Sequence, residues 1–536
     1  MRAVLLGPNQ QENLALQYLA AAARQSGHEA HLVSFNSRTD VAKSVRDALA
    51  FGPDVIGIAM QFQHSIDDGL GLARALRDAG FAGHLTCGGH VATFCYAELL
   101  RDGPFDSVVR HEGESTFAGL LDVVAAGKPV VGVAGLAWRE GEGIGVGARR
   151  AAVKDLDVLP WPERQPNAYL VAGIPIAFLL TSRGCTETCS YCSISAFSRD
   201  DGGLAFRLRS PAAVACEVEY LYQRGARVFF VQDDLFVLGS ESATLARVSA
   251  LTREMRARGI DGAVFWVKGR PDTITAPVLD SLRAMGAVHL FLGVESAVVE
   301  RLAYLGRCHR PADNQRAIAL CHAHGIVPSF NLMLFDPDCS LEDVAVTMDF
   351  ARQHLELPWN LCRTEIYSGT PLCRRLADQG RLQGDYRSYG YRMRDDRAEL
   401  MFRVLRVALH ERAFAFDSLL NRLISLSFAR QLHECFFPGP STQQVSQDVL
   451  DLVRTVHADT LAILDQSLAL AARKPTEAEA VREQAVAMAL AAARRELPWR
   501  VQADRLWEHL HLHGRTLLAQ ETELRAREPG LALNLH

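Results

Sequence analysis

The sequence lacks a long hydrophobic run. Its longest apolar stretch, Tyr169 to Leu180, is interrupted by Gly173 and Pro175 and falls short of the ~20 residues that a membrane-spanning helix needs. The apolar run at the start of the chain is also too short for a secretory signal peptide. We therefore expect a cytoplasmic protein that does not bind a membrane.

An excess of positive charge is also absent. The 536 residues include 57 Lys and Arg against 62 Asp and Glu, a net charge of -5. Such a balance does not favour a nucleic-acid partner, whose phosphates attract basic surfaces. Hydrophobic residues make up 49% of the chain, which is typical of globular proteins, and the length suits about three or four domains.

Paired cysteine knuckles are missing as well. Of the 12 cysteines, most stand singly, and without an export signal a disulfide framework is not expected. We interpret the single ones as small buried hydrophobes; they are Cys87, Cys95, Cys216, Cys308, Cys321, Cys339, Cys362, Cys373 and Cys435. Only Cys185, Cys189 and Cys192 lie close together.

Up to about residue 130, short apolar runs alternate with helical patterns, which indicates an α/β fold with a doubly wound parallel sheet, Rossmann-like in type. The predicted strands are Arg2 to Leu6, Ala30 to Phe35, Val55 to Met60, His84 to Cys87 and Ser107 to Arg110. Such sheets bind ligands at the carboxyl ends of their strands. The polar residues and glycines that follow these strands are therefore candidates for ligand binding, although ordinary tight turns would have the same composition.

A second series of strand and helix patterns runs from about residue 175 to 372 and predicts a partial (β/α)6 barrel. Its predicted strands are Ala177 to Thr181, Val228 to Gln232, Phe265 to Val267, His289 to Gly293, Ser329 to Leu334 and Arg363 to Ile366. The connector before it holds a predicted hairpin at Glu140–Gly143. After it, glycine and proline become rare, which predicts an all-α region, with one helix starting at a Thr476–Glu479 capping box.

We accordingly expect four parts. They are a Rossmann-like domain at 1–135, a linker at 136–172, a partial TIM barrel at 173–385 and a helical domain at 386–536. We expect the helical part to close the open side of the barrel.

The three clustered cysteines form a Cys-x3-Cys-x2-Cys motif directly after a predicted strand. Three thiolates on one loop can bind three corners of a 4Fe-4S cluster. The fourth iron then has no protein ligand and can chelate a substrate. A structural zinc site is the alternative, but it needs a fourth ligand and usually a second cysteine pair.

With this motif, residues 175 to 372 resemble a radical S-adenosylmethionine (SAM) core, and residues 1 to 130 resemble the cobalamin-binding domain often fused ahead of it. The resemblance implies that the three cysteines are both metal ligands and catalytic. It also implies SAM contacts from Tyr191, beside the last cysteine, and from residues at later strand ends. These are Asp233, Asp234, Lys268, Arg270, Glu295, Ser296 and Asn331, with Ser329 and Arg363 as weaker candidates.

The same resemblance implies cobalamin contacts from the turns after the first, third, fourth and fifth predicted strands: Asn13, Gln61, His64, Ser65, Gly88, Gly89, His90, Glu112, Gly113 and Glu114. The first turn, Gly7 to Asn13, has no histidine. The cobalt would then lack a histidine ligand below it, although His64 and His90 remain candidates. A domain that only packs on the barrel or binds a partner is the alternative.

We therefore predict a cobalamin-dependent radical SAM methyltransferase. It would use a 5'-deoxyadenosyl radical and methylcobalamin to methylate an unactivated carbon of a small molecule or specialised metabolite, with electrons from a donor such as flavodoxin or ferredoxin. Two alternatives remain: a radical SAM cyclase or rearrangement enzyme with the same cofactors, and a non-catalytic cobalamin or redox sensor.

Overall fold

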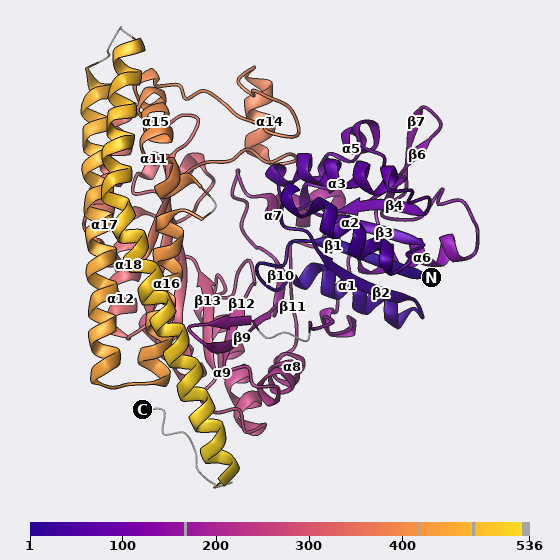
Figure 1. Ribbon diagram of the computed structural model, residues 1–536, viewed down its shortest axis with the longest axis horizontal. Coiled ribbons are helices and arrows are strands. Elements are labelled where there is room, and N and C mark those ends of the chain that lie inside the picture. Colours follow the sequence, from indigo (N-terminus) through magenta and orange to yellow (C-terminus); the bar gives the residue numbers. More distant parts are fainter. Residues whose placement is uncertain (166–168, 416, 474–477, 528–536) are drawn as a thin grey trace. The chain divides into compact units, whose positions relative to one another are not determined.

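The computed structural model describes residues 1–165, 169–415, 417–473 and 478–527, so the predicted helix start at Thr476 lies outside the described residues. The chain divides into two compact units, each built from separate segments. Unit 1 contains Met1–Asn167, Phe178–Ala213 and Glu365–Tyr391, and unit 2 contains Ala168–Ala177, Val214–Thr364 and Arg392–His536. Figure 1 colours these segments by their order in the sequence.

Unit 1 is built on a seven-stranded sheet in the order β2-β1-β3-β4-β5-β6-β7. The first five strands pair in parallel, whereas β6 and β7 form the predicted antiparallel hairpin. Their bounds are β1 Arg2–Gly7, β2 Glu29–Ser34, β3 Val55–Ala59, β4 His84–Gly88, β5 Ser107–Val109, β6 Leu136–Glu140 and β7 Gly143–Val146. This confirms the predicted doubly wound sheet.

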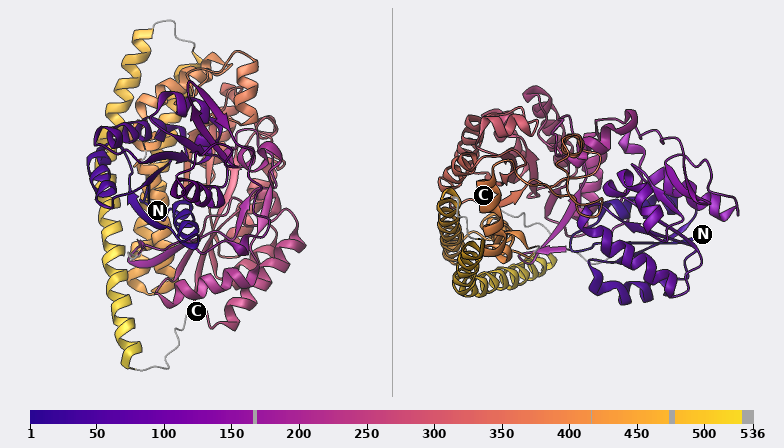
Figure 2. Two further views of the ribbon diagram at one scale, coloured as in Figure 1. Left: turned by 90° about the vertical axis from the view of Figure 1, so that its right-hand side faces the viewer. Right: turned by 90° about the horizontal axis from the view of Figure 1, so that it is seen from above.

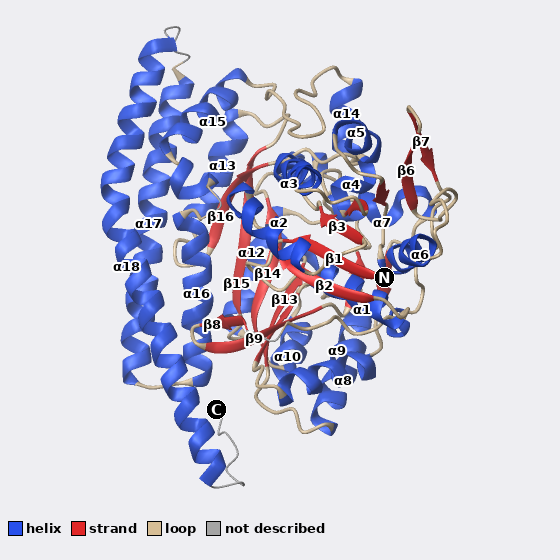
Figure 3. Ribbon diagram, turned by 45° about the vertical axis from the view of Figure 1, so that its right-hand side comes forward, coloured by secondary structure: helices blue, strands red, loops and turns tan. Residues whose placement is uncertain are grey.

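Helices cover both faces of this sheet (Figure 3). Because neighbouring side chains on a strand point to opposite faces, Leu5 packs in one hydrophobic cluster and Leu6 in the other. Helices α1 (Leu14–Gln25) and α6 (Glu114–Ala125) contribute to the first cluster. Helices α2 (Val41–Ala50), α3 (Ile66–Asp78), α4 (His90–Phe94) and α5 (Tyr96–Asp102) contribute to the second.

Two later segments of the chain complete unit 1. The first forms an antiparallel pair, β10 (Ser182–Gly184) with β11 (Phe206–Leu208), and holds helix α7 (Ser193–Arg199) between these strands. The second segment contains α14 (Pro371–Asp378), and the backbone N–H of Leu372 donates to the Ser190 carbonyl of the first segment at 2.8 Å.

Unit 2 contains the barrel strands in the order β16-β15-β14-β13-β12-β9-β8, with β16 and β8 at opposite edges. Strands β12 to β16 pair in parallel, and β8 is antiparallel to β9. Their bounds are β8 Tyr169–Val171, β9 Ile174–Leu179, β12 Val228–Val231, β13 Val264–Gly269, β14 Ala287–Glu295, β15 Val327–Phe335 and β16 Trp359–Arg363. This confirms the predicted partial barrel.

The last barrel strand was predicted wrongly at Arg363 to Ile366. The ladder with β15 instead runs from Trp359 to Arg363, because Trp359 pairs with Phe330 at one end and Arg363 with Phe335 at the other. The buried Trp359 and Leu361 point to one face, as a strand requires. The residues after Arg363 turn away and belong to unit 1 from Glu365 onward.

The end of unit 2 is helical, as predicted. It holds α15 (Asp396–Ala408), α16 (Leu419–Phe436), α17 (Pro440–Ala472) and α18 (Ala478–Arg527), and Pro498 lies inside α18 rather than ending it. Figure 2 shows α17 and α18 running side by side. On α16, Phe428, Leu432 and Phe436 pack with Val264 and Trp266 of β13. Among the described helices, none is both long and apolar enough to cross a membrane.

Candidate functional site: a cysteine loop beside a parallel sheet

The cysteine motif lies on the loop between β10 and α7, within unit 1. Cys189 is buried, Cys185 and Cys192 are half-buried, and none of the three forms a disulfide. The backbone N–H of Cys192 donates to the Cys189 carbonyl at 3.2 Å, and the N–H of Glu187 donates to Cys185 Sγ at 3.5 Å. A backbone donor aimed at a sulfur stabilises a thiolate, as is common around iron-sulfur clusters.

Arg199, the last residue of α7, holds this loop in shape. Its Nη2 atom donates to the carbonyl oxygens of Cys185 at 3.2 Å, Thr186 at 2.6 Å and Glu187 at 3.3 Å. A planar guanidinium has donors in a fixed arrangement, so it can bind several carbonyls of one turn. Arg199 therefore anchors the loop through three of its backbone carbonyls.

The donor set fits a 4Fe-4S cluster. Three cysteines outside any disulfide, on one anchored loop, match the three protein corners that such a cluster needs. In the part of the chain that the structure describes, no three His, Cys, Asp or Glu side chains gather around a point that one metal ion would occupy. A cluster does not require this, because it binds each thiolate at a separate iron.

The loop between β5 and α6 makes ion pairs with the β10–β11 pair. Arg183 on β10 donates through Nη2 to Glu114 Oε1 at 2.5 Å, and Arg207 on β11 donates through Nη1 to Glu112 Oε2 at 3.0 Å. Burial raises the pKa of Glu114, but Arg183 outweighs burial and leaves that pKa below its usual value. Both carboxylates are thus bound to arginines.

His111, which begins this loop, has a strained backbone. Its φ of 61° lies in the left-handed region, which side chains other than glycine rarely adopt. Its N–H donates to Thr93 Oγ1 at 2.8 Å, and its Nε2 lies 2.8 Å from Asp200 Oδ2. Burial lowers the pKa of His111 despite the nearby Asp200. The contacts of His111 therefore hold an unfavourable conformation in place.

This strain predicts an unusual order of two substitutions. Both His111→Ala and His111→Gly remove the contact with Asp200, but only alanine must keep the left-handed backbone at a steric cost. We expect His111→Gly to be more stable than His111→Ala by about 1 kcal/mol. Urea unfolding of the two variants measures the difference, and equal stability would show that the backbone relaxes when the side chain is lost.

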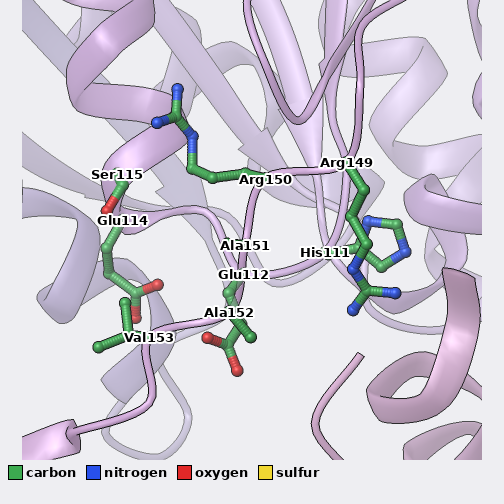
Figure 4. Close-up of a pocket in the computed structure, with 9 residues that line it drawn as sticks. All are labelled: His111, Glu112, Glu114, Ser115, Arg149, Arg150, Ala151, Ala152 and Val153. Carbon is green, nitrogen blue, oxygen red and sulfur yellow. The ribbon is translucent and has the colours of Figure 1, made fainter. Parts of the chain in front are cut away.

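A small pocket lies next to the same loop (Figure 4). One wall is formed by residues from His111 to Ser115 and the other by residues 149–153 of the connector. In Figure 4 the Arg149 side chain extends toward the His111 ring, whereas Arg150 points away from it. Arg150 donates through Nε to Thr116 Oγ1 at 3.0 Å. The connector and the β5–α6 loop thus lie on opposite sides of this pocket.

Several predicted cobalamin contacts make hydrogen bonds or close contacts within unit 1. Asn13 caps α1, with Oδ1 accepting from the Leu16 N–H at 3.2 Å. Ser65 Oγ donates to the Phe62 carbonyl at 2.7 Å. Gly89 has a φ of 124°, and a Cβ there would lie 2.4 Å from the Met60 carbonyl oxygen. Position 89 therefore requires glycine, because the backbone just after β3 leaves no room for a Cβ atom.

The remaining turn residues differ in exposure. The half-buried His90 packs against Phe197 of α7, with ring centroids 4.3 Å apart, and burial lowers its pKa to about 4. His64 is exposed and stacks on Phe62, which is itself 43% exposed. Their stacked rings present an open aromatic surface after β3, next to Gln61. Gly88 ends β4, and Gly113 packs against Leu19.

In unit 2, the strand ends place the predicted acidic residues in different environments. Asp233 is fully buried, and Arg247 donates to it at 3.4 Å, whereas Asp234 is exposed. Lys268 is half-buried at the end of β13. Burial lowers the pKa of Lys268, although both aspartates favour its charged form. Of these three, Asp234 and Lys268 have side chains that are accessible to a ligand.

The other predicted SAM contacts in unit 2 also differ in their burial and hydrogen bonds. Arg270 binds Asp272 through Nε at 3.1 Å and Nη2 at 2.6 Å. Glu295 ends β14 with a left-handed φ of 63°. The buried Ser296 accepts from the Val298 N–H at 3.2 Å. Asn331 is half-buried on β15. Of the four, Arg270, Glu295 and Asn331 are half-buried, whereas Ser296 is buried and less accessible to a ligand.

Sequence reasoning missed the residues that connect distant segments. Arg183, Arg199 and Arg207 stand among the cluster residues, yet no local pattern marks them as partners of Glu112 or of the loop carbonyls. Buried His289 was likewise unassigned, although its Nε2 lies 2.7 Å from Ser329 Oγ and its Nδ1 lies 2.8 Å from Gln431 Oε1. Such pairs depend on tertiary structure, which a single sequence does not reveal.

Comparison with known families identifies two parts of the chain. Residues 7–121 match the B12 binding domain, and residues 179–351 match the Radical SAM superfamily. The chain therefore joins a B12-binding domain to a radical SAM domain. Within the radical SAM proteins it resembles the cobalamin-dependent methyltransferases, as the sequence predicted.

Curated relatives are similar over much of the chain. An uncharacterized methyltransferase of Pyrococcus horikoshii is 26% identical over 63% of this chain and 73% of its own length. A hopanoid C-3 methylase of Methylococcus capsulatus is 25% identical over 67% of each protein. An anaerobic magnesium-protoporphyrin IX monomethyl ester cyclase of Cereibacter sphaeroides is 28% identical over 57% of this chain, which spans only half of that cyclase.

Solved structures share the fold. The cobalamin-dependent SAM radical enzyme OxsB, solved with aqua-cobalamin and SAM, has a TM-score of 0.62 at 14% identity and covers 95% of this chain and 84% of its own. The radical SAM methyltransferase TsrM of Kitasatospora setae, solved with cobalamin and a [4Fe-4S] cluster, has a TM-score of 0.59 at 19% identity and covers 70% and 75%. At these identities the likeness establishes the fold.

Proposed function

We propose that the protein is a cobalamin-dependent radical SAM enzyme that transfers a methyl group to an unactivated carbon of a small molecule. The observation that carries this proposal is the anchored loop with three closely spaced cysteines, which lies in the same compact unit as the B12-binding sheet. When bound, the cluster and SAM supply a 5'-deoxyadenosyl radical, and cobalamin supplies the methyl group. The chain binds and orients these groups and excludes water.

We assign the cluster to Cys185, Cys189 and Cys192. For SAM, the accessible residues at the barrel strand ends are the strongest candidates, because a carboxylate suits an ammonium or ribose donor and a cation suits a carboxylate. These are Asp234, Lys268, Glu295 and Asn331, together with Tyr191 beside the third cysteine. Asp233 and Ser296 are weaker candidates because they are buried, and Arg270, which binds Asp272, also stays a candidate.

For cobalamin, we assign the turns at the carboxyl edge of the unit 1 sheet. His64 and Gln61 stand on the exposed turn after β3, where Phe62 offers a flat apolar surface to a corrin ring. Ser65, Gly88 and Gly89 shape the adjoining backbone. Asn13, His90, Glu112, Gly113 and Glu114 stay candidates for indirect roles, because each packs against or bonds to other protein groups.

The proposal is tested with anaerobically reconstituted protein. After reduction in the presence of SAM and hydroxocobalamin, we expect 5'-deoxyadenosine and S-adenosylhomocysteine to form together, and corrin absorption to stay with the protein through gel filtration. Mass spectrometry measures the two products, and iron analysis measures the metal content of the protein. Purified material that binds zinc in place of iron, or that forms no 5'-deoxyadenosine, would rule the proposal out.

A second candidate uses the same cofactors but ends in ring closure or rearrangement. The similarity to the magnesium-protoporphyrin cyclase of Cereibacter sphaeroides favours keeping it. Product mass separates the two, because methyl transfer adds one methyl group and rearrangement adds none. A protein that binds both cofactors and never cleaves SAM would instead be a sensor.

Three further assignments belong to this proposal. We place the domain boundaries at 1–135, 136–172, 173–385 and 386–536. We expect a cytoplasmic enzyme. Its electrons would come from a donor such as flavodoxin or ferredoxin, because the cluster must be reduced before SAM is cleaved.

A further inference from the structure

Two buried ion pairs connect the β5–α6 loop to both strands that flank the cysteine loop. Arg183 precedes Cys185 by two residues and pairs with Glu114, and these side chains are 15% and 10% exposed. Arg207, on the strand that follows the loop, pairs with Glu112, and these side chains are 8% and 21% exposed. Ion pairs this well buried are weakly screened by solvent, so losing one partner leaves an uncompensated charge.

A third contact involves the segment directly after α7. Asp200 lies 2.8 Å from His111 Nε2, and the Phe197 ring of α7 lies 5.8 Å from the His111 ring. The β5–α6 loop thus contacts β10, β11 and the end of α7, three different elements around the cysteines. Because these three elements surround the cysteine loop, their contacts with the β5–α6 loop restrain both the position and the rotation of the cysteine loop.

From this arrangement we infer that Glu112 and Glu114 are positioning residues for the cluster-bearing loop. They hold the cysteines at a fixed place beside the carboxyl edge of the B12-binding sheet, through Arg207 and Arg183. The inference rests on the proposed function, because a fixed spacing between cluster and cobalamin matters only if both are used in one reaction. The two carboxylates then act through arginines and need not touch cobalamin.

The first experiment measures the loop itself in the cofactor-free full chain. Hydrogen exchange of residues 185–199 is compared between the natural protein and Glu114→Gln, which keeps the side-chain shape but removes the charge. We expect exchange in this segment to become about tenfold faster, the change that loss of one coupled buried pair produces. Glu112→Gln should act in the same direction.

A matched control separates this role from general stability. Arg77 pairs with Asp106 at 2.6 Å in the same unit, and Arg77→Met also removes an arginine–carboxylate pair. We expect Arg77→Met to leave exchange of residues 185–199 unchanged. Equal acceleration in both variants would mean that the ion pairs stabilise only the domain, and no acceleration in Glu114→Gln would overturn the inference.

A double-mutant cycle tests whether the partners act through each other. If Glu114 works through Arg183, then Arg183→Met combined with Glu114→Gln should accelerate exchange no more than Arg183→Met alone. Additive effects would show that Glu114 acts elsewhere. Should Arg183→Met fail to fold, Glu112→Gln and Glu114→Gln still test the inference, because both keep the shape of the natural side chain.

The second readout is a product ratio in the reconstituted enzyme. SAM cleavage to 5'-deoxyadenosine needs only the cluster, whereas S-adenosylhomocysteine formation also needs cobalamin within reach. We expect Glu114→Gln to lower S-adenosylhomocysteine several-fold relative to 5'-deoxyadenosine, and a parallel fall of both would contradict a positioning role. The exchange experiment uses no cofactor, so its outcome is independent of whether the proposed function holds.

Discussion

Replacing Cys189 by serine should abolish cluster binding and, with it, all SAM cleavage. Cys189 is the most buried of the three motif cysteines, and its carbonyl accepts the Cys192 N–H that shapes the loop. A serine hydroxyl is a far weaker iron ligand than a thiolate. Since even an outer partner of a metal ligand contributes roughly 10–100-fold to affinity, loss of a direct ligand should reduce bound iron and 5'-deoxyadenosine formation by at least about 100-fold.

The matched control for this variant is Cys308→Ser, a change of the same atoms at an exposed cysteine outside the motif. We expect it to keep full iron content and cluster absorption. Hydrogen exchange should also show that Cys189→Ser is folded before reconstitution. If folded Cys189→Ser retained iron at the natural level, the cysteine motif would not be the cluster ligand.

Replacing Arg412 by methionine should strongly destabilise the helical part of unit 2. The Arg412 side chain is fully buried, and it donates to Glu496 at 3.0 Å and to Asp459 at 2.6 Å. Its guanidinium also lies 5.4 Å from the Trp499 ring. The two carboxylates would lose their buried cation and keep only Arg495 and Arg500, which are more exposed. We therefore expect a loss of about 3 kcal/mol, the low end of the range for a broken buried pair.

Hydrogen exchange of α17 and α18 measures this loss as a local opening free energy. Lys43→Met serves as the comparison, since Lys43 and Asp47 form an exposed pair on α2, and such pairs contribute at most about 1 kcal/mol. Adding Glu496→Gln to Arg412→Met should recover part of the stability. If Arg412→Met exchanges like the natural protein, the network around Arg412 is not stabilising.

Much of the fold was predictable because it depends on local patterns. The five parallel strands of the B12-binding sheet follow from short apolar runs between helical patterns, and the predicted and observed bounds differ by about one residue. The last barrel strand was misplaced because Arg363 to Ile366 has the composition of a strand, whereas the actual ladder is set by pairing with β15. Pairing is a tertiary property.

The candidate site was predictable to a smaller extent. The cysteine motif is local, so the sequence alone located it. The roles of Glu112 and Glu114 depend on Arg183 and Arg207, which stand 69 and 95 residues away in their hydrogen-bonded pairs. Contacts at such separations follow no short pattern, and the left-handed backbone of His111 has no marker in a non-glycine residue either.

The division of the chain into interleaved segments has a consequence for biosynthesis. The unit that bears the cysteine loop includes Glu365–Tyr391, so it cannot close until the ribosome has made nearly three quarters of the protein. A shortened gene that ends after the B12-binding sheet, or one that starts at the barrel, would encode neither unit in full. Expression of separate halves should therefore yield useful material only when both are made together and allowed to associate.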